Sequence, residues 1–319
     1  MSDSMSDARP DVVTTPRAEP VQLSVVICTY RRYDALQQTL EALLASRGFH
    51  ETPCEVVVVE NTPPDRREPI AIPDLPNVRV VVCEQVGLSN ARNYGISATS
   101  GEVVAFLDDD ALVCDDWCRL LLEAFADPEI SVVGGKVVPL YPSDNLPAWY
   151  DDKLAGYLSC IDWGPRTRHL LAGEWIVGAN MAFRRSVFDT YGLFGTELGR
   201  KGSASLLSNE EIALLEKVGM TRVLYVPSAS VQHMIPMDRL TPKWFRRRVY
   251  WQAVSDMVAG IASKDGAEAR KEFGKLVAGF EAERRNLNGM FFEPENYEQF
   301  AQQLSAIYLA SLVFGDGGF

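Results

Sequence analysis

The sequence has no apolar run long enough to cross a membrane, and none that follows a basic start. The longest late apolar stretch, from Leu304 to Phe314, is far shorter than the roughly 20 residues that a spanning helix requires, so it predicts a buried helix face. We expect residues 1–20 to be a polar, disordered tail rather than a signal peptide or a membrane anchor. These features predict a cytoplasmic protein.

Basic side chains are scarce relative to acidic ones. The chain has 31 lysines and arginines against 43 aspartates and glutamates, a formal charge of −12. Phosphate binding requires an excess of lysine and arginine, so the sequence disfavours nonspecific binding to nucleic acid. An anionic cofactor must therefore be met by a local cluster of basic groups. Apolar residues make up 47% of the chain, which is typical of a folded globule.

Disulfide pairs and a glycine-rich phosphate loop are also not expected. Six cysteines are scattered along the chain, and without a secretion signal we expect them to be reduced thiols. Cys114 and Cys118 could share a helix face, but no histidine lies near them in sequence, which disfavours a zinc site. The turn after the first predicted strand, Cys28 to Tyr33, has no glycine, which argues against a backbone cradle for a triphosphate.

Four short apolar runs rich in valine or isoleucine predict buried strands at 23–28, 55–59, 78–83 and 103–107. Between the first two, leucines recur at helical spacing from Leu36 to Leu44, and Asp34 stands where an N-cap would be. Continuously apolar strands separated by helices are typical of a parallel sheet covered on both faces. The sequence therefore predicts an α/β, nucleotide-binding fold with a mostly parallel central sheet.

Polar residues follow each predicted strand, at the edge where such sheets bind ligands. The fourth strand ends in Asp108-Asp109-Asp110, whose adjacent carboxylates repel one another beside an apolar run. A hard divalent cation such as Mg²⁺ or Mn²⁺ would resolve this repulsion and keep positions open for substrate phosphates. The alternative is the start of a helix, where acidic residues are also favourable.

The rest of the chain predicts an inserted segment, a mobile loop and a helical appendage. Aromatic residues accumulate over 139–173, a strand and a helix are expected around 179–191, and glycine and serine over 195–208 favour a lid. Residues 241–260 predict a basic amphipathic helix, and 267–314 predict two or more helices. The expected domains are a catalytic domain over 21–240, with a nucleotide-binding half (21–138) and an acceptor-binding half (139–240), and a helical C-terminal region over 241–319.

Several separated segments carry a resemblance to a known family. They read SVVICTYRR, VVVVENT, GLSNARNYGI, SGEVVAFLDDDA, GANMAFRRSVF, SNEEIALL and LYVPSASVQH, in this order, over about residues 23 to 233. In these segments the chain resembles the family 2 glycosyltransferases, which have a GT-A fold. The resemblance implies a mostly parallel nucleotide-binding sheet and an inverting, non-processive sugar transfer that depends on Mn²⁺ or Mg²⁺.

The resemblance also implies roles in the donor pocket. The matching positions are Thr29, Tyr30 and Arg32 in the first turn, Glu60 where the family usually has an aspartate that recognises the base, and Arg92 and Asn93 in the helix after the third strand. Asp108 would serve the nucleoside and Asp110 the cation, with Asp109 assisting. For Arg92 and Asn93 the alternative is a capped amphipathic helix with a solvated arginine.

In the segment Asn209-Glu210-Glu211, the last residue aligns with the catalytic aspartate of the family. An inverting transfer needs a carboxylate that removes the proton of the acceptor hydroxyl during its attack on the anomeric carbon. We favour Glu211 over Glu210 as this base, although paired acids are also ordinary at a helix start. His233 matches a position that can join the cation or the diphosphate in similar enzymes, and a purely structural histidine is the alternative.

The segment from Trp244 to Trp251 combines three arginines with large aromatics on one predicted helix. Arg246 and Arg247 could grip a diphosphate, the helix could rest on an anionic membrane, or the arginines could simply be solvated. Trp149, Tyr150 and Trp163 could form a platform for an acceptor sugar, although core packing explains these aromatics equally well.

Taken with the resemblance, the sequence predicts transfer of a hexose from a nucleotide diphosphate sugar, with a UDP-sugar expected, to a hydroxyl of a sugar, glycolipid or small molecule. A noncatalytic scaffold that binds sugar nucleotides is one alternative, and a sugar-phosphate nucleotidyltransferase is a more remote one. Residues 241–260 could also bring the protein to the inner face of a membrane. The sequence does not predict an oligomeric state.

Overall fold

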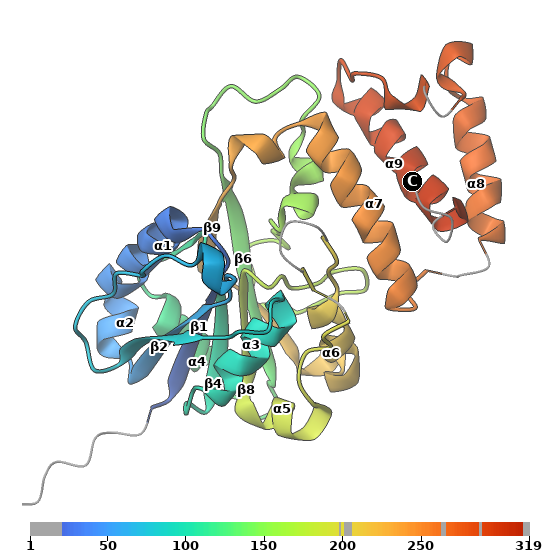
Figure 1. The fold of residues 1–319 in the computed structure, drawn as a ribbon. Helices are drawn as coiled ribbons and strands as arrows, with labels where there is room; N and C mark the ends of the chain where they lie inside the picture. The colour runs from blue at the N-terminus through green and yellow to red at the C-terminus, as the bar shows by residue number, and fades with distance from the viewer. Residues whose placement is uncertain (1–20, 198, 201–205, 263–265, 287–288, 315–319) are drawn as a thin grey trace, which may run out of the picture.

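One continuous sheet joins the N-terminal and middle parts of the chain. The computed structural model describes residues 21–197, 199–200, 206–262, 266–286 and 289–314. The sheet has the strand order β3-β2-β1-β4-β8-β6-β9-β5, and β7 pairs with β9 outside this path. From β3 to β4 all neighbours are parallel, whereas β8 is antiparallel to both β4 and β6. Figure 1 shows the sheet between layers of helices, with a further group of helices beyond one end.

The four strands predicted from the apolar runs are confirmed. They are β1 (Leu23–Thr29), β2 (Cys54–Glu60), β3 (Val78–Val82) and β4 (Val103–Asp108). Alternate residues of β1 face two cores, because Val25 and Ile27 pack with one set of helices and Val26 with another. The first set is α1 (Tyr33–Ala45), α2 (Arg47–Glu51) and α4 (Trp117–Ala124), and the second is α3 (Leu88–Ser97), α5 (Arg185–Tyr191) and α6 (Glu210–Val218). Burial on both faces explains the continuously apolar strands.

The second half of the sheet has strands of mixed direction. These are β5 (Ala111–Val113), β6 (Val132–Leu140), β7 (Arg168–His169), β8 (Asn180–Arg184) and β9 (Val223–Met234). Strand β6 crosses the predicted boundary at residue 138, so the sheet does not divide there. The predicted domain limits otherwise stay a prediction, and the lid expected over 195–208 lies partly outside the described residues, at 198 and 201–205.

Helix α1 begins one residue before its predicted N-cap. Arg32 occupies the cap position without a side-chain capping hydrogen bond, and Asp34 lies in the first turn. There its negative charge still interacts favourably with the positive end of the helix dipole. Acidic residues suit both positions, so the sequence alone could not distinguish them. Short 3₁₀ helices connect the other elements: η1 (Pro64–Arg66), η2 (Asp152–Leu158), η3 (Met220–Arg222), η4 (Met237–Arg239), η5 (Ala282–Arg284) and η6 (Gly289–Phe291).

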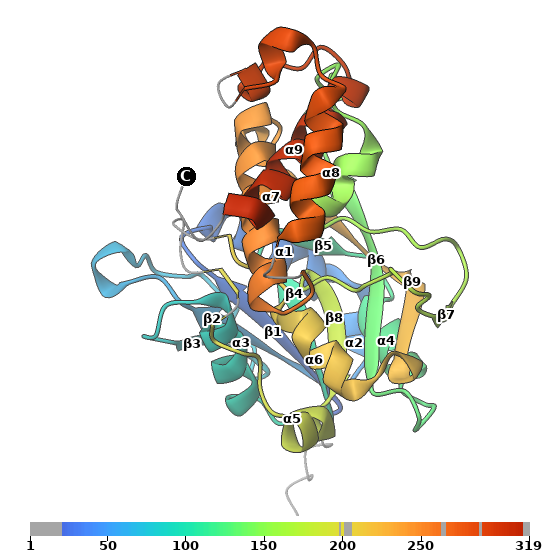
Figure 2. The same ribbon diagram turned by 90° about the vertical axis from the view of Figure 1, so that its right-hand side faces the viewer.

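The predicted helical C-terminus is confirmed. It contains α7 (Pro242–Val258), α8 (Ala267–Ala278) and α9 (Tyr297–Phe314). Thr241 caps α7, since its hydroxyl accepts the Trp244 N–H at 3.2 Å, and Pro242 follows at the first helical position. Figure 2 shows the three helices grouped beyond the sheet. Within the described ranges, none of the helices combines the length and the apolar character needed to cross a membrane.

Candidate active site

The triple aspartate forms the link between β4 and β5. Asp108 ends β4, and Ala111 begins β5 directly after Asp110. Ala111 is paired with His233 on β9, and the Met234 N–H donates to the carbonyl of Asp110 at 2.8 Å. Backbone pairing therefore holds Asp110 beside His233, although the two residues are far apart in the sequence.

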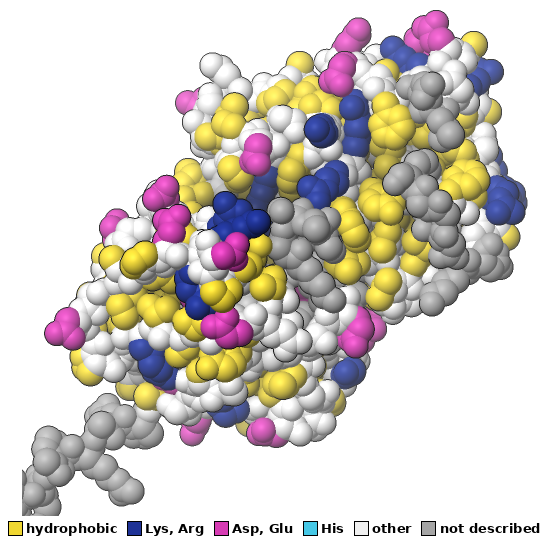
Figure 3. Space-filling view, in the orientation of Figure 1, with side chains coloured by type: hydrophobic (Ala, Val, Ile, Leu, Met, Phe, Trp, Pro, Cys, Tyr) yellow, Lys and Arg dark blue, Asp and Glu magenta, His cyan; other side chains and the backbone are white. Residues whose placement is uncertain are grey.

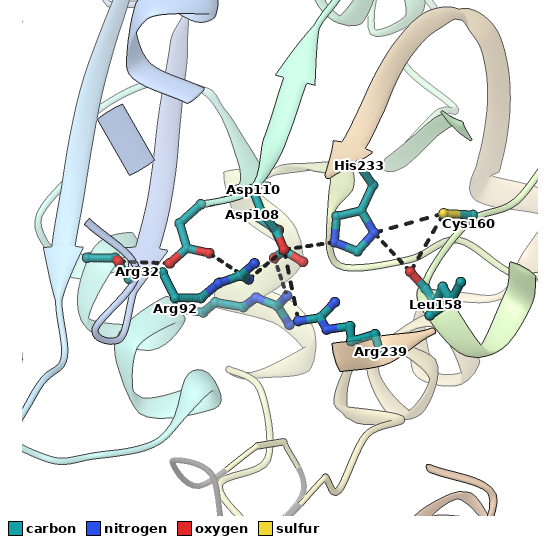
Figure 4. Close-up of polar contacts among 10 residues, drawn as sticks. Arg32, Arg92, Asp108, Asp110, Leu158, Cys160, His233 and Arg239 are labelled. Atoms are coloured by element: carbon teal, nitrogen blue, oxygen red, sulfur yellow. Dashed lines mark hydrogen bonds and ion pairs between the residues drawn. The ribbon is translucent and has the colours of Figure 1, made fainter. Parts of the chain in front are cut away.

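Asp108, Asp110 and His233 bring three possible metal ligands together. One oxygen from each carboxylate and one ring nitrogen of His233 all lie within 4.8 Å of one another. The His233 Nε2 atom is 3.1 Å from Asp110 Oδ2, and Figure 4 shows these two side chains facing each other. Asp110 and His233 are the two residues that the resemblance implied as cation ligands, and the cluster adds Asp108 to them.

The contacts around His233 turn one ring nitrogen away from the cluster and the other toward Asp110. Nδ1 lies 2.9 Å from the carbonyl oxygen of Leu158, which can only accept, so Nδ1 carries a proton. Nε2 instead faces Asp110 Oδ2 at 3.1 Å, and Asp110 Oδ1 is buried without a hydrogen-bond partner among the described residues. A histidine that donates its other N–H to a backbone carbonyl is typical of metal sites. The donor set of two carboxylates and one imidazole fits Mn²⁺ or Mg²⁺.

Two arginines neutralise part of the negative charge in this cluster. Arg32 Nη1 lies 2.5 Å from Asp110 Oδ2 and 3.2 Å from Asp109 Oδ1, and Arg239 Nη2 lies 4.0 Å from Asp110 Oδ2. Burial by itself would raise the pKa of Asp110, but His233, Arg32 and Arg239 together hold that pKa well below its ordinary range. Asp110 is therefore ionised, as a metal ligand must be.

A cleft of about 340 Å³ opens beside the aspartates. Its lining includes five residues predicted for the donor site, namely Thr29, Tyr30, Arg32, Asp108 and Asp109. It also includes residues that the sequence analysis did not select, namely Asn61, Arg200, Asp238 and Arg239.

Figure 3 shows lysine and arginine side chains gathered between the sheet and the C-terminal helices. The local basic cluster expected for an anionic ligand is therefore present in a chain of net charge −12. We call this cavity the donor cleft.

Asn93, predicted for the donor pocket, holds a neighbouring loop. Its side-chain amide donates to the Phe194 carbonyl at 2.9 Å and accepts the Phe194 N–H at 3.0 Å. The amide thus donates to and accepts from one backbone position, and its role in the donor pocket stays a prediction. Glu60 makes a local contact, because its Oε1 accepts the Thr62 N–H at 2.7 Å. Its Oε2 is buried without a hydrogen-bond partner in the described structure. Its role in base recognition stays a prediction.

A second cavity of about 570 Å³ adjoins the donor cleft, and we call it the acceptor pocket after the role predicted for the glutamates that line it. Asp108 and Arg200 line both cavities. The start of α6 contributes Glu210 and Glu211, which line the acceptor pocket but not the donor cleft. The predicted catalytic pair therefore lies where an acceptor could meet a sugar held beside Asp108.

The two glutamates of α6 have different environments. Glu210 Oε1 lies 2.5 Å from Arg92 Nη1, and both side chains are fully buried. Arg92 Nη2 is also 3.6 Å from Asp108 Oδ1, so this arginine connects Glu210 to the triple aspartate. Glu211 Oε2 has no hydrogen-bond partner in the described structure. Burial, followed by repulsion from Glu210, raises the pKa of Glu211 to about 8. Both glutamates keep one buried oxygen, Oε2, without a hydrogen-bond partner in the described structure, but only Glu210 is paired with Arg92. Glu211, whose pKa is raised, is the better placed of the two to take a proton.

The aromatic side chains predicted as an acceptor platform mostly belong to the core. Trp149 is only 8% exposed, and its ring packs at 4.7 Å from Phe300 and 5.7 Å from Phe245, between α9 and α7. Tyr150 packs beside it with its hydroxyl 2.7 Å from that of Tyr141. These contacts place Trp149 in the core, whereas the platform role of the half-buried Tyr150 stays a prediction.

Trp163 supports a residue that does line the acceptor pocket. Its indole N–H donates to the Trp175 carbonyl at 2.7 Å, and the two rings are 4.8 Å apart. Trp175 lines the pocket, and sequence reasoning did not select it. Trp175 is therefore an aromatic residue of the pocket lining, and Trp163 holds it in place.

Arg246, predicted to grip a diphosphate, points to the C-terminal helices instead. Its guanidinium donates to Gln303 Oε1 at 2.9 Å and to the Phe292 carbonyl at 2.6 Å. Arg247 is exposed and lines the donor cleft, as the prediction requires. The third arginine, Arg248, is buried and lines the acceptor pocket.

Trp149→Ala is expected to lower the free energy of unfolding by about 3–5 kcal/mol, because removal of a buried tryptophan leaves a cavity between α7 and α9. Chemical denaturation of the purified protein measures this change. A loss under about 1 kcal/mol together with a raised KM for the acceptor would contradict the core assignment and restore the platform role.

The comparison with known sequences decides the family. The profile of "Glycosyl transferase family 2" matches residues 24–192, more than half of the chain. The chain belongs to this family. It is therefore a glycosyltransferase with a GT-A fold, as the resemblance implied. The matched residues run from β1 to the end of α5 and contain the triple aspartate, whereas α6 and His233 lie beyond them.

Two curated relatives and one solved structure extend this result. A glucosyl-dolichyl phosphate glucuronosyltransferase of Haloferax volcanii is 29% identical over 308 residues, 93% of this chain and 95% of the relative. The succinoglycan biosynthesis protein ExoM of Rhizobium meliloti is 27% identical over 72% of each chain. A mannosyltransferase of Pyrobaculum calidifontis, solved with GDP-Man and Mn²⁺, has a TM-score of 0.53 at 16% identity, covering 98% of this chain and 92% of that one. The last similarity shows the fold.

Proposed function

We propose that this glycosyltransferase moves a hexose from a nucleotide diphosphate sugar, with a UDP-sugar as first candidate, to a hydroxyl acceptor, with inversion and with Mn²⁺ or Mg²⁺. The observation that carries the proposal is the position of Asp108. It belongs to the possible metal cluster and lines both the donor cleft and the acceptor pocket. A sugar joined to a diphosphate at this cluster would reach from one cavity into the other.

The donor half of the proposal rests on the residues of the donor cleft. Asp108, Asp110 and His233 would hold the cation, which when bound neutralises the diphosphate as it departs. Arg32, Arg239 and Arg247 line the same cleft and can donate to phosphate oxygens. The Pyrobaculum structure, which contains GDP-Man and Mn²⁺, supports a nucleotide sugar and a divalent cation in this fold.

The acceptor half rests on Glu211. Its carboxylate would take the proton of the acceptor hydroxyl while that oxygen attacks the anomeric carbon from the face opposite the diphosphate. The bond between the anomeric carbon and the diphosphate oxygen breaks, and its electron pair leaves with the diphosphate. A single displacement of this kind inverts the anomeric configuration. The name of the Haloferax relative, a glucuronosyltransferase of glucosyl-dolichyl phosphate, supports a sugar hydroxyl as acceptor.

The reaction should depend on pH through Glu211. Since the pKa of this carboxyl is raised to about 8 and the base must be deprotonated, kcat/KM should fall about tenfold for each pH unit below about 8. Above that value it should level off. A pH profile at saturating Mg²⁺ measures this, and a profile that is flat from pH 6 to 9 would contradict the assignment of Glu211.

Release of nucleoside diphosphate tests the proposal as a whole. Sugar nucleotides with uridine, guanosine, thymidine, cytidine and adenosine are each mixed with the enzyme, a simple glycoside acceptor and Mn²⁺. One of them should be turned over, EDTA should abolish the release, and proton NMR of an α-linked donor's product should show a β linkage. Turnover that is insensitive to EDTA would contradict the metal dependence. A retained α linkage would contradict the inversion.

A further inference from the structure

The acceptor pocket contains a buried arginine whose charge is not matched by a hydrogen-bonded carboxylate. Arg248 lies on α7, is only 8% exposed and lines the pocket. Its Nη2 donates to two neutral oxygens, Ser208 Oγ at 3.3 Å and Gln252 Oε1 at 2.8 Å. Nε and Nη1 are buried with no hydrogen-bond acceptor among the described residues. Two donor nitrogens of a buried cation are thus left without partners.

The carboxylates nearest to Arg248 along α7 and α6 are already engaged or carry another role. Asp256 accepts hydrogen bonds from Asn209 at 2.8 Å, Gln252 at 2.7 Å and Tyr308 at 2.7 Å. Glu210 is paired with Arg92. Glu211 faces the same pocket and attracts Arg248 only at longer range. The charge of Arg248 therefore points to a group that enters the pocket from outside.

A second arginine adds positive charge to the same cavity. Arg200 lines both the acceptor pocket and the donor cleft. Burial, followed by repulsion from Arg200, lowers the pKa of Arg248 to about 10, so the guanidinium is still charged at neutral pH. Burying an arginine without a hydrogen-bonded counter-charge among the described residues is unfavourable, and packing does not require the charge, since an apolar side chain of similar length would fill the space. An anionic ligand would remove this cost.

We propose that Arg248, assisted by Arg200, binds a carboxylate or phosphate group that one of the two substrates carries outside the nucleoside diphosphate. The inference rests on the proposed function, because it takes the acceptor pocket as the place where the transferred sugar and the acceptor meet. The anionic group belongs either to the transferred sugar, as in a uronic acid, or to the acceptor, as in a sugar phosphate. In both cases the enzyme selects an acidic substrate over its neutral counterpart.

Two pairs of probes distinguish these sources by titration calorimetry on the full-length enzyme. The donor pair is UDP-glucuronate and UDP-glucose with Mn²⁺, which differ at one carboxylate. The acceptor pair is glucose 1-phosphate and methyl glucoside in EDTA, where no divalent cation can hold the phosphate. In one pair the wild-type enzyme should bind the anionic member roughly tenfold or more tightly than the neutral one, the size expected of charged hydrogen bonds.

Arg248→Met should reduce that preference to within about threefold and leave the affinity for the neutral member unchanged. Lys243→Met is the matched control, since Lys243 lies on the exposed side of α7 and its loss should leave the preference intact. If Arg248→Met does not fold, Arg200→Met replaces a half-exposed arginine of the same pocket and should also reduce the preference.

The inference is overturned if the wild-type enzyme shows no anionic preference in either pair, or if both arginine variants keep it. Its failure is distinct from a failure of the proposed function. Titration of UDP alone with Mn²⁺ reports on the donor cleft, and the acceptor pair tests Arg248 without any nucleotide.

Discussion

Asp110→Ala should lower kcat/KM by about 10³-fold at a fixed, moderate Mn²⁺ concentration, the size of effect seen when one electrostatic contact to a transition state is lost. Asp110 is 1% exposed, its Oδ2 lies 3.1 Å from His233 Nε2 and 2.5 Å from Arg32 Nη1, and its Oδ1 has no hydrogen-bond partner in the described structure. Without it, one carboxylate and one imidazole remain of the cluster, and the departing diphosphate loses its counter-charge. Initial rates over a range of Mn²⁺ concentrations measure the change.

Asp189→Ala provides the control for this variant. Asp189 lies on α5 and is exposed, so its loss removes the same charge without touching the site and should leave kcat/KM within about twofold. Circular dichroism should show both variants folded. If Asp110→Ala kept most of its activity, or if its rate no longer depended on Mn²⁺ while staying high, the assignment of this cluster to the cation would be wrong.

Glu211→Gln should lower kcat by about 10² to 10⁴-fold while the affinity for the sugar nucleotide stays nearly constant. Glutamine has the shape of glutamate but cannot accept the proton of the acceptor hydroxyl. Because Glu211 lines the acceptor pocket and not the donor cleft, donor binding should be unaffected. Single-turnover kinetics, together with calorimetric titration of the donor, separate the two effects.

Two further glutamates of α6 make this test specific. Glu216→Gln changes an exposed residue of the same helix and should leave kcat unchanged. Glu210→Gln should lower the melting temperature, because Arg92 loses a charged partner in a fully buried ion pair. A loss of activity in Glu210→Gln without a loss of stability, combined with an active Glu211→Gln enzyme, would move the base from Glu211 to Glu210.

The sequence predicted those parts of the fold that depend on local pattern. Four valine-rich runs correspond to four strands: β1, β2 and β4 are continuously apolar because both of their faces are buried, and β3 is a half-buried edge strand. The residues after these strands were expected at one edge of the sheet, and Thr29 and Asp108 do lie together in the donor cleft. Parallel pairing puts the carboxyl ends of neighbouring strands side by side, so strand position was sufficient for this part of the site.

Other parts of the site depend on contacts that no local pattern encodes. The three consecutive arginines of α7 point in different directions, about 100° apart around the helix, and the sequence could not show which direction faces the pocket. Arg246 meets Gln303 of α9, whereas Arg248 meets Gln252 in the acceptor pocket. Trp149 resembles a binding residue in sequence because only the fold shows Phe300 covering it. Arg239 was missed because only tertiary packing brings η4 to Asp110.

Binding of nucleoside diphosphates with and without Mn²⁺ tests the central claim, that Asp110 and its neighbours hold a cation for a diphosphate. Thermal unfolding of the wild-type enzyme and of Asp110→Ala is followed with the diphosphates of uridine, guanosine, thymidine, cytidine and adenosine. A ligand that binds only the folded state stabilises it, and the stabilisation increases with the ratio of ligand concentration to Kd. We predict that one diphosphate raises the wild-type melting temperature by several degrees only when Mn²⁺ is present, and that Asp110→Ala abolishes the shift. Stabilisation that is independent of Mn²⁺, or no stabilisation by any diphosphate, would contradict the account.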